Sequence, residues 1–517
     1  MTSPALLRRG ADLGRARPAA LILAVVCIAQ FMVVLDVSIV NVALPDMQRD
    51  LHMTQNGLGW VLNAYTLTFA GFLLLGGRAA DLWGRRRLFL IGVGLFTLTS
   101  LIGGLAQTGG ELIGARALQG LGGAVLSPAT LTILTTTFTE PKARTRALGL
   151  WSAVAGAGGA TGVLAGGILT DLLSWRWILF INIPIGLLVL VVARFAIAES
   201  RAEGERPTLD WAGAVTVTGG LVALVYGIVS TDSHSWGSPL VLSCITVGVV
   251  LLALFLWIES RHAHPLVPLR LFRSRALTGA NIIMTLIGSA MFALFFFLSQ
   301  FLQEVQGYSP LRAGFAFLPM PLSIIAGSQI SSRLVARVGA RRLLVVGPLI
   351  AATGLALLSR LHADSGYLLH VGLPGAIITF GVGMSFVPVT LSATGGVDRK
   401  DAGLASGLIN TTRQIGGSLG LAALLTIAAS RTASQRSAGF AVAETAGFAR
   451  AFAVGAVLLL VAALVAALVI PARVASLQHA ATAEPEERSD EVRQDEVRPG
   501  AFAGGPDLAY ATPSEQP

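Results

Sequence analysis

Three ionisable residues lie well inside long apolar stretches of this chain: Asp36, Arg116 and Arg413. A charged side chain costs about 2.5–3.5 kcal/mol at the centre of a membrane helix, so its default interpretation is functional. A buried carboxylate can bind and release protons near neutral pH, which makes Asp36 a candidate proton site. A structural ion pair, or a position in a wet vestibule, is the alternative.

Arg116 is the candidate partner of Asp36. Each of the two residues lies about five positions from the same end of its stretch, at a depth of roughly 8 Å for helices rising 1.5 Å per residue. Gln119 follows Arg116 on the same helical face. The two charges are therefore expected to pair if their helices touch.

Arg413 lies near the middle of its stretch, which holds no acidic residue to neutralise it. Its guanidinium group has three open assignments: a bond to backbone carbonyls and Gln414, a water-mediated link to Asp36, or contact with an anionic group of a substrate. The structural and the substrate interpretations are equally favoured.

Glycine and aromatic residues supply further candidates. Gly158, Gly162 and Gly166 are spaced by four and share one helical face, which favours close helix packing and, as a sharper alternative, a moving contact. Aromatic residues in two stretches are candidates to line an apolar cavity, although ordinary packing is the commoner role of each. They are Tyr65, Phe69 and Phe72, and Phe292, Phe295, Phe296 and Phe297.

Fourteen apolar stretches must position these residues. The chain has 517 residues, 54% hydrophobic and 13% charged, against roughly 25% charged in soluble domains. Stretches of about 20 apolar residues predict membrane-spanning helices, since a barrel strand would alternate and be about half as long. The expected spans are 19–41, 57–77, 88–106, 111–138, 147–169, 177–198, 211–230, 239–258, 277–302, 311–332, 343–360, 370–394, 403–429 and 449–471. The expected fold is an all-α polytopic membrane protein.

Basic residues gather in alternate gaps between the stretches. Of 37 Lys and Arg residues, 27 lie in one set of gaps and four in the other. The positive-inside rule then places the basic set, and both termini, in the cytoplasm. This distribution argues against a nucleic-acid partner, because the basic residues form no single face.

An internal repeat divides the chain. Gly84, Arg86, Arg87, Leu88 and Gly92 recur 255 positions later, and parallel repeats of six-helix halves are typical of transporters. The expected parts are an N-terminal segment 1–18, a six-helix half 19–198, a linker with two inserted helices 199–258, a second half 259–472, and a disordered tail 473–517.

The chain resembles the major facilitator superfamily, in its fourteen-helix drug:proton antiporter branch, over about residues 19–471. Several motifs carry the likeness. They are the loop Gly77-x-x-x-Asp81-x-x-Gly84-Arg85-Arg86, the first-helix run Leu35–Pro45, the run Arg116–Gly120, the run Trp175–Gly186, the loop Pro265–Leu269 and the run Gly307–Pro319. The fifth-helix motif has Gly158, Gly162, Gly166 and Gly167, but Val163 stands where the branch usually has Pro.

The resemblance implies alternating access driven by the proton gradient. Asp36 would be the proton or substrate carboxylate and Arg116 would tune its protonation. Asp81 and Arg85, with the glycines and Arg86 of their loop, would form a cytoplasmic latch near Asp401, at the start of the thirteenth span. A carboxylate at a helix N-terminus is favoured by the helix dipole.

The predicted function is proton-coupled export of small amphipathic or hydrophobic compounds, such as drugs or antibiotics, across the cell membrane. Lipid, protons and the substrate would be the partners, without a cofactor or a metal; a periplasm-spanning adaptor stays open. The alternatives are a facilitator or importer of one metabolite, and an embedded enzyme or receptor. The chain has no Gly-Lys dipeptide for a P-loop, no His-Glu-x-x-His and no nucleophile–base set, so an enzyme is not expected.

Overall fold

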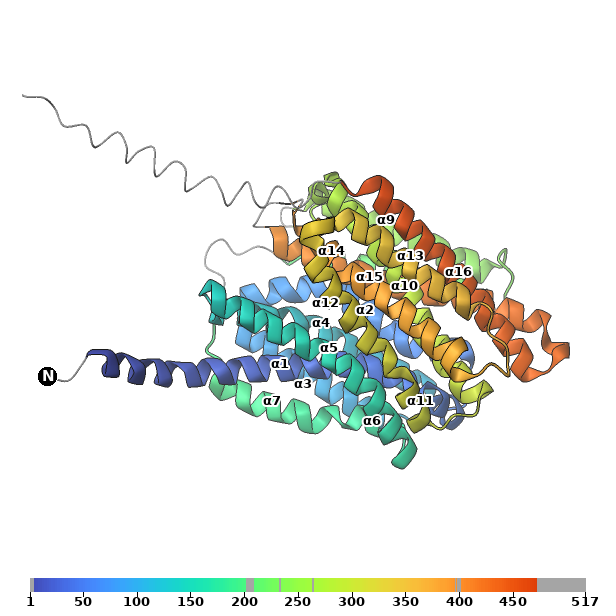
Figure 1. Cartoon of the computed structure of the whole chain (residues 1–517), viewed down its shortest axis with the longest axis horizontal. Coiled ribbons are helices and arrows are strands. Elements are labelled where there is room, and N and C mark those ends of the chain that lie inside the picture. Colours follow the sequence, from blue (N-terminus) through green and yellow to red (C-terminus); the bar gives the residue numbers. More distant parts are fainter. Residues whose placement is uncertain are drawn as a thin grey trace, which may run out of the picture. The chain divides into compact units, whose positions relative to one another are not determined.

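The computed structural model describes residues 4–200, 209–231, 234–262, 265–395, 397 and 401–471, and all regular structure in them is helical (Figure 1). The predicted tail, 473–517, lies outside the described residues. The α-helices are α1 (Pro4–Asp50), α2 (Gln55–Trp83), α3 (Arg85–Gly104), α4 (Gly109–Thr137), α5 (Pro141–Leu172), α6 (Trp177–Phe180), α7 (Asn182–Ala196), α8 (Trp211–Ser230), α9 (Pro239–Arg261), α10 (Arg275–Gln300), α11 (Pro310–Phe317), α12 (Pro319–Val338), α13 (Ala340–Leu358), α14 (Leu373–Gly395), α15 (Ala402–Ser434) and α16 (Phe440–Val469). Short 3₁₀ or π segments are η1 (Leu269–Arg273), η2 (Phe301–Val305), η3 (Leu368–Gly372) and η5 (Arg436–Ala438).

Thirteen helices in the described residues are long and apolar enough to cross a membrane. They correspond to thirteen of the fourteen predicted spans. The remaining one, 147–169, lies within α5, a helix of 32 residues that is not among the thirteen. The all-α membrane fold is therefore confirmed, while the count of fourteen stays a prediction.

Prolines interrupt two of the predicted spans. The sixth, 177–198, is divided at Ile181 into α6 and α7, and the tenth, 311–332, is divided at Leu318 into α11 and α12. Pro184 and Pro321 have no N–H to donate to the carbonyls of Phe180 and Phe317, four residues back. One α-helix therefore ends, and the next begins, just before each of these two prolines.

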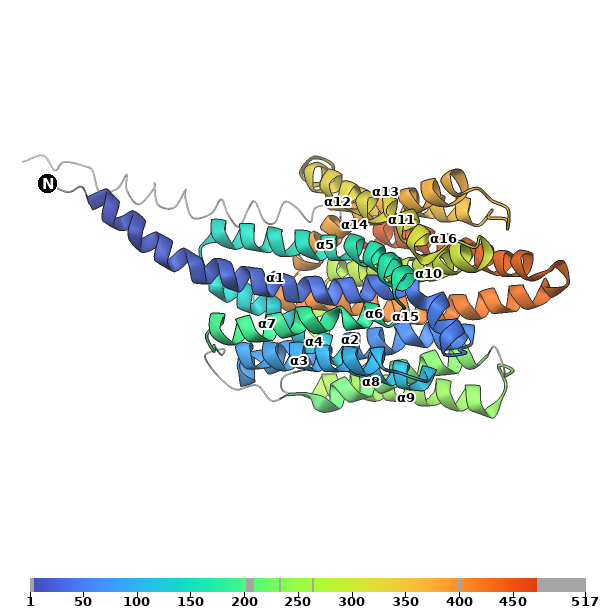
Figure 2. The same cartoon turned by 90° about the horizontal axis from the view of Figure 1, so that it is seen from below.

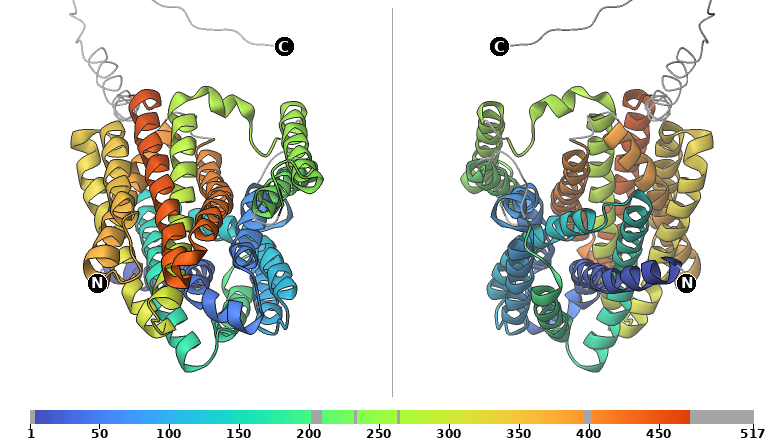
Figure 3. Two further views of the ribbon diagram at one scale, coloured as in Figure 1. Left: turned by 90° about the vertical axis from the view of Figure 1, so that its right-hand side faces the viewer. Right: turned by 90° about the vertical axis from the view of Figure 1, so that its left-hand side faces the viewer.

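Helices α1–α7 pack mainly against one another, and so do α10–α16. We call these sets the N-terminal group and the C-terminal group; the domain boundaries derived from the sequence stay a prediction. Figure 3, viewed along the helices, shows the N-terminal group in blue to teal beside the C-terminal group in yellow to red. The inserted pair α8 and α9 lies along one edge, opposite α12 and α13 (Figure 2).

The two groups meet mainly where α1 packs on α10, α2 on α15, and α5 on α11. The end of the bundle that holds the α1–α2 loop is called the α1–α2 end, and the opposite one the α2–α3 end. Ser299 Oγ donates to the carbonyl of Asn41 at 2.6 Å, and Gln303 Nε2 donates to that of Val42 at 2.8 Å. Pro45 frees the Asn41 carbonyl from its helical partner. These bonds join the groups at the α1–α2 end.

Candidate functional site

Asp36, on α1, is fully buried at the centre of a hydrogen-bonded network. Its Oδ2 atom accepts a hydrogen bond from Nη1 of Arg116 at 2.5 Å, which forms an ion pair between α1 and α4. Its Oδ1 atom accepts from Nε2 of Gln119 at 2.8 Å and from Nδ2 of Asn182, on α7, at 2.9 Å. The structure pairs Asp36 with Arg116, as expected if their helices touch, and Gln119, on the same face of α4 as Arg116, also reaches Asp36.

Arg116 is also buried and fully enclosed by partners. Its Nη1 atom donates to Gln119 Oε1 at 2.7 Å and its Nε atom donates to the Val61 carbonyl at 3.3 Å. The centre of its guanidinium group lies 4.4 Å from the centre of the Tyr65 ring. Because a buried charge is costly unless it is paired and hydrogen-bonded, these contacts are what allow an ion pair inside the helix bundle.

Ser100 and Asn182 complete the network, and neither is among the site residues predicted from the sequence. Ser100 Oγ accepts from Asn182 Nδ2 at 2.9 Å and from Gln119 Nε2 at 3.2 Å, and it donates to the Leu179 carbonyl at 2.9 Å. A buried amide inside the Trp175–Gly186 motif was a usable signal for Asn182. Ser100 offered none, because serine in a membrane helix commonly bonds to its own backbone.

The network can hold a carboxyl group that changes protonation state. Asp36, on α1, is an acceptor when ionised and a donor when protonated, and the other side chains of the network come from three further helices, α3, α4 and α7. A change in charge at Asp36 would alter contacts on all four. That arrangement suits a site that links proton binding to helix movement.

Arg413, on α15, is half-buried and is not part of this network. Within the described residues it makes no hydrogen bond and no ion pair, and the Oε1 atom of the adjacent Gln414 is also without a partner. The bonds to backbone carbonyls and Gln414 that the sequence left open are therefore not formed in this structure. Its backbone packs closely against Gly288 of α10.

The aromatic candidates are placed differently from one another. Tyr65 and Phe69 are buried and stack with ring centres 5.8 Å apart, and Phe296 is fully buried edge-on against Phe297 at 5.4 Å. These side chains pack in the interior of the helix bundle. Phe292 is half-buried beside Gly417, so it keeps partial access to open space.

Glycines of α5 allow it to lie directly against α1. A Cβ atom at Gly158 would lie 3.1 Å from the Phe31 carbonyl oxygen, one at Gly162 would lie 2.8 Å from that of Leu35, and one at Gly166 would lie 2.8 Å from that of Ile39. Glycines spaced by four residues on α5 thus contact carbonyls spaced by four residues on α1. Asp36 lies within this contacted segment of α1. The close-packing interpretation therefore describes this structure, and any movement of the contact stays a prediction.

Gly167 faces a different helix. A Cβ there would lie 2.7 Å from the carbonyl oxygen of Pro310, on α11, and one at Gly314 would lie 3.0 Å from that of Val163. This contact joins the N-terminal and C-terminal groups at the α1–α2 end. Val163, in the place where the related branch usually has proline, is buried next to it.

The loop expected to form a latch is held by Glu199, which is not among the site residues predicted from the sequence. The Glu199 carboxylate accepts hydrogen bonds from the backbone N–H of Arg86 and of Arg87, each at 3.1 Å, at the start of α3. Gly84 has a φ of +109°, which favours glycine, and a Cβ there would lie 2.5 Å from Glu199 Oε1. An acidic group is thus bound at the N-terminus of α3, where the helix dipole favours it.

The predicted contact of Asp81 cannot be followed, because its side chain lies outside those that the structure describes. Gly77 packs against Pro128 of α4, and the Arg85 N–H donates to the Ser200 carbonyl at 2.9 Å. Asp401, the expected neighbour of Asp81, forms an ion pair with Arg270 at 2.9 Å.

Replacing Glu199 with Ala is expected to lower the free energy of unfolding by about 1–2 kcal/mol, because two N-terminal N–H groups of α3 lose their charged acceptor. Thermal unfolding of the purified protein in detergent would measure this. Glu140→Ala is the matched control, since Glu140 precedes α5 without making a side-chain cap bond. Equal effects of the two substitutions would contradict the assignment.

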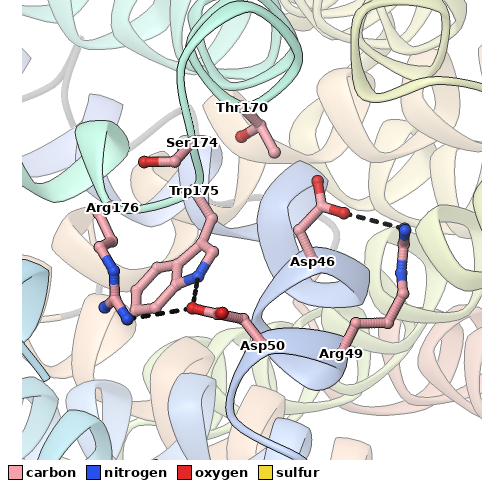
Figure 4. Close-up of a pocket in the computed structure, with 7 residues that line it drawn as sticks. All are labelled: Asp46, Arg49, Asp50, Thr170, Ser174, Trp175 and Arg176. Atoms are coloured by element: carbon pink, nitrogen blue, oxygen red, sulfur yellow. Dashed lines mark hydrogen bonds and ion pairs between the residues drawn. The ribbon is translucent and has the colours of Figure 1, made fainter. Parts of the chain in front are cut away.

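A cleft of about 610 Å³ opens at the α1–α2 end. Figure 4 shows its lining: Asp46, Arg49, Asp50, Thr170, Ser174, Trp175 and Arg176. Asp50 Oδ2 accepts from Trp175 Nε1 at 2.9 Å and from Arg176 Nη2 at 3.0 Å, so these acidic and basic groups largely satisfy one another. The cleft lies about ten residues, or roughly 15 Å along α1, from Asp36.

In the part of the chain that the structure describes, thirteen candidate membrane helices and a buried carboxylate–guanidinium pair define a multi-pass protein of the cell membrane built on a transporter fold. The chain belongs to the Major Facilitator Superfamily, whose family model matches residues 26–421. This family consists of membrane transporters.

Two similar relatives are bacterial proteins. The puromycin resistance protein of Streptomyces alboniger is 44% identical over 415 residues, covering 80% of this chain and 82% of the relative. The cephamycin export protein of Amycolatopsis lactamdurans is 46% identical over 416 residues, covering 80% of this chain and 85% of the relative. A solved bacterial homologue of the human lysosomal transporter Spinster, in an inward-facing conformation, shares the fold with a TM-score of 0.61 at 16% identity, covering 87% of this chain and 97% of that one.

Proposed function

We propose that this protein is a proton-coupled exporter of small amphipathic or hydrophobic compounds, such as antibiotics. The buried pair of Asp36 and Arg116, at 2.5 Å, carries the proposal, because a proton-driven transporter needs an ionisable group inside the membrane. The two relatives named for puromycin resistance and cephamycin export support the direction and the class of substrate.

Alternating access is the mechanism we infer. Contacts of α5 with α11, and hydrogen bonds of α10 and η2 to α1, join the two groups at the α1–α2 end. The basic residues in alternate gaps support placing the opposite, α2–α3 end and both termini in the cytoplasm. In this orientation the protein is closed outside. We also propose that α5 crosses the membrane, which brings the number of spans to fourteen, and that the loop Gly77–Arg86 is a cytoplasmic latch.

Arg413 has a secondary role in this proposal. The lack of a protein partner among the described residues favours contact with a substrate or with water over a structural ion pair. We propose that Arg413 meets an anionic or strongly polar group of those compounds that carry one. Phe292, half-buried nearby on α10, would contact their apolar parts.

Export of fluorescent hydrophobic dyes from cells that produce the protein tests this function. The expected result is extrusion that stops when a protonophore removes the proton gradient. Cells carrying the vector alone are the control. Extrusion that continues unchanged in the protonophore would contradict proton coupling, and dye accumulation inside the cells would favour an importer instead.

A further inference from the structure

Hydrogen-bond donors outnumber free acceptors around Asp36. Arg116 has no acceptor atom. Gln119 Oε1 already accepts from Arg116 Nη1 at 2.7 Å. Ser100 Oγ accepts from two amides while donating to the Leu179 carbonyl. This set of neighbours suits an ionised Asp36, but a protonated Asp36 has an O–H that needs an acceptor.

Asn182 has the one side-chain oxygen without a partner among the four residues that surround Asp36 in this network. Its Oδ1 atom makes no hydrogen bond with any described residue, although the side chain is fully buried. Its Nδ2 atom donates to Asp36 Oδ1 and to Ser100 Oγ, each at 2.9 Å. Buried polar atoms are nearly always paired, so an unpaired oxygen next to a titratable group calls for an explanation.

We propose that Asn182 is a positioning residue that accepts the hydrogen bond of protonated Asp36; this rests on the proposed proton coupling. A hydronium ion transfers a proton to Asp36 Oδ1: one O–H bond of the hydronium breaks, an O–H bond to Oδ1 forms, and a water molecule is released. The Asn182 amide then turns over, placing its Oδ1 atom where its Nδ2 atom stood. The terminal torsion of asparagine is broad, so this rotation is accessible. Arg116 continues to donate to Asp36 Oδ2.

Tyr65 is the rival acceptor. Its hydroxyl group is buried and also has no partner among the described residues. However, the ring of Tyr65 lies against the Arg116 guanidinium group, and its hydroxyl oxygen lies 3.1 Å from the position of a Cβ on Gly123 of α4. Two titratable groups lie beside Asp36 on neighbouring helices: the charged Arg116 on α4 and Tyr65 on α2. The neighbouring residues on α3 and α7, Ser100 and Asn182, are neutral. Tyr65→Phe removes the rival hydroxyl alone.

Infrared difference spectroscopy of the full-length purified protein, taken between neutral and acidic pH with carbon-13 in the asparagine side-chain carbonyls, tests the proposal. We expect protonation to shift one labelled carbonyl band. The shift disappears in Asn182→Leu, which has the same number and branching of side-chain heavy atoms, and in Asp36→Asn, and it persists in Tyr65→Phe. A shift that survives in Asn182→Leu, or that disappears in Tyr65→Phe, overturns the proposal. If Asn182→Leu does not fold, Asn182→Ser serves in its place, because it also removes the labelled carbonyl.

Transport assays separate this proposal from the proposed function. Asn182→Leu is expected to reduce export against a gradient about tenfold or more, and Asn182→Ser, whose hydroxyl group both donates and accepts, is expected to restore part of it. If Asp36→Asn still exports against a gradient, proton coupling through Asp36 is wrong. If Asp36→Asn fails to export while Asn182→Leu keeps the infrared shift, only the role of Asn182 is wrong.

Discussion

Asp36→Asn is expected to abolish export against a concentration gradient. One elementary charge moving across 100 mV releases about 2.3 kcal/mol, enough to sustain a gradient of about 50-fold for each proton exchanged. Asparagine cannot exchange a proton in this range, so the accumulation ratio should fall to that of cells without the protein. Uptake of substrate into inverted membrane vesicles, with an imposed proton gradient, measures this ratio.

Stability needs its own control, because Asp36→Asn leaves the charge of Arg116 buried without a counter-charge. Removing one member of a buried pair typically costs 3–5 kcal/mol. The double variant Asp36→Asn with Arg116→Gln contains no such charge, so it should unfold closer to the wild-type temperature while still failing to export. Export against a gradient by a well-folded double variant would show that the coupling carboxylate lies elsewhere.

The Asp36–Arg116 pair could be predicted because depth in a membrane helix follows from counting residues. Each residue adds 1.5 Å, so two charges at equal distance from the same end must lie at the same level. Counting says nothing about rotation of one helix about its axis. Whether Asn182 faces Asp36 or lipid depends on how α7 packs on α1 and α3, and that is set by the whole bundle.

Glu199 was missed for a different reason. It lies after the last predicted residue of a span, in a segment that hydropathy treats as a linker, and its bonds join residues more than 110 positions apart. The structural effect of Pro45 was also not anticipated. The sequence shows a proline in the first helix, but only the assembled bundle shows that Ser299 donates a hydrogen bond to the Asn41 carbonyl that Pro45 leaves free.

Gly162→Ala is expected to destabilise the protein and reduce export, although alanine is the better helix former. The new Cβ atom would lie 2.8 Å from the Leu35 carbonyl oxygen and 2.8 Å from the Ser38 Cβ atom, closer than van der Waals contact allows. Overpacking of this kind costs about 1–3 kcal/mol. Because Leu35 precedes Asp36, pushing α1 away from α5 would also displace the carboxylate from Arg116, and export should fall about tenfold or more.

Gly159→Ala is the matched control for this contact. It makes the same chemical change on the same helix, but its Cβ would have only the Ser38 hydroxyl nearby, at 3.8 Å. Helix propensity alone then predicts a gain of up to about 1 kcal/mol. The midpoint temperature of unfolding should fall for Gly162→Ala and rise for Gly159→Ala, and only Gly162→Ala should lose export. Similar stabilisation in both would mean that α1 and α5 are not held together as closely as the glycine register indicates, and that Asp36 is positioned by α4 and α7 alone.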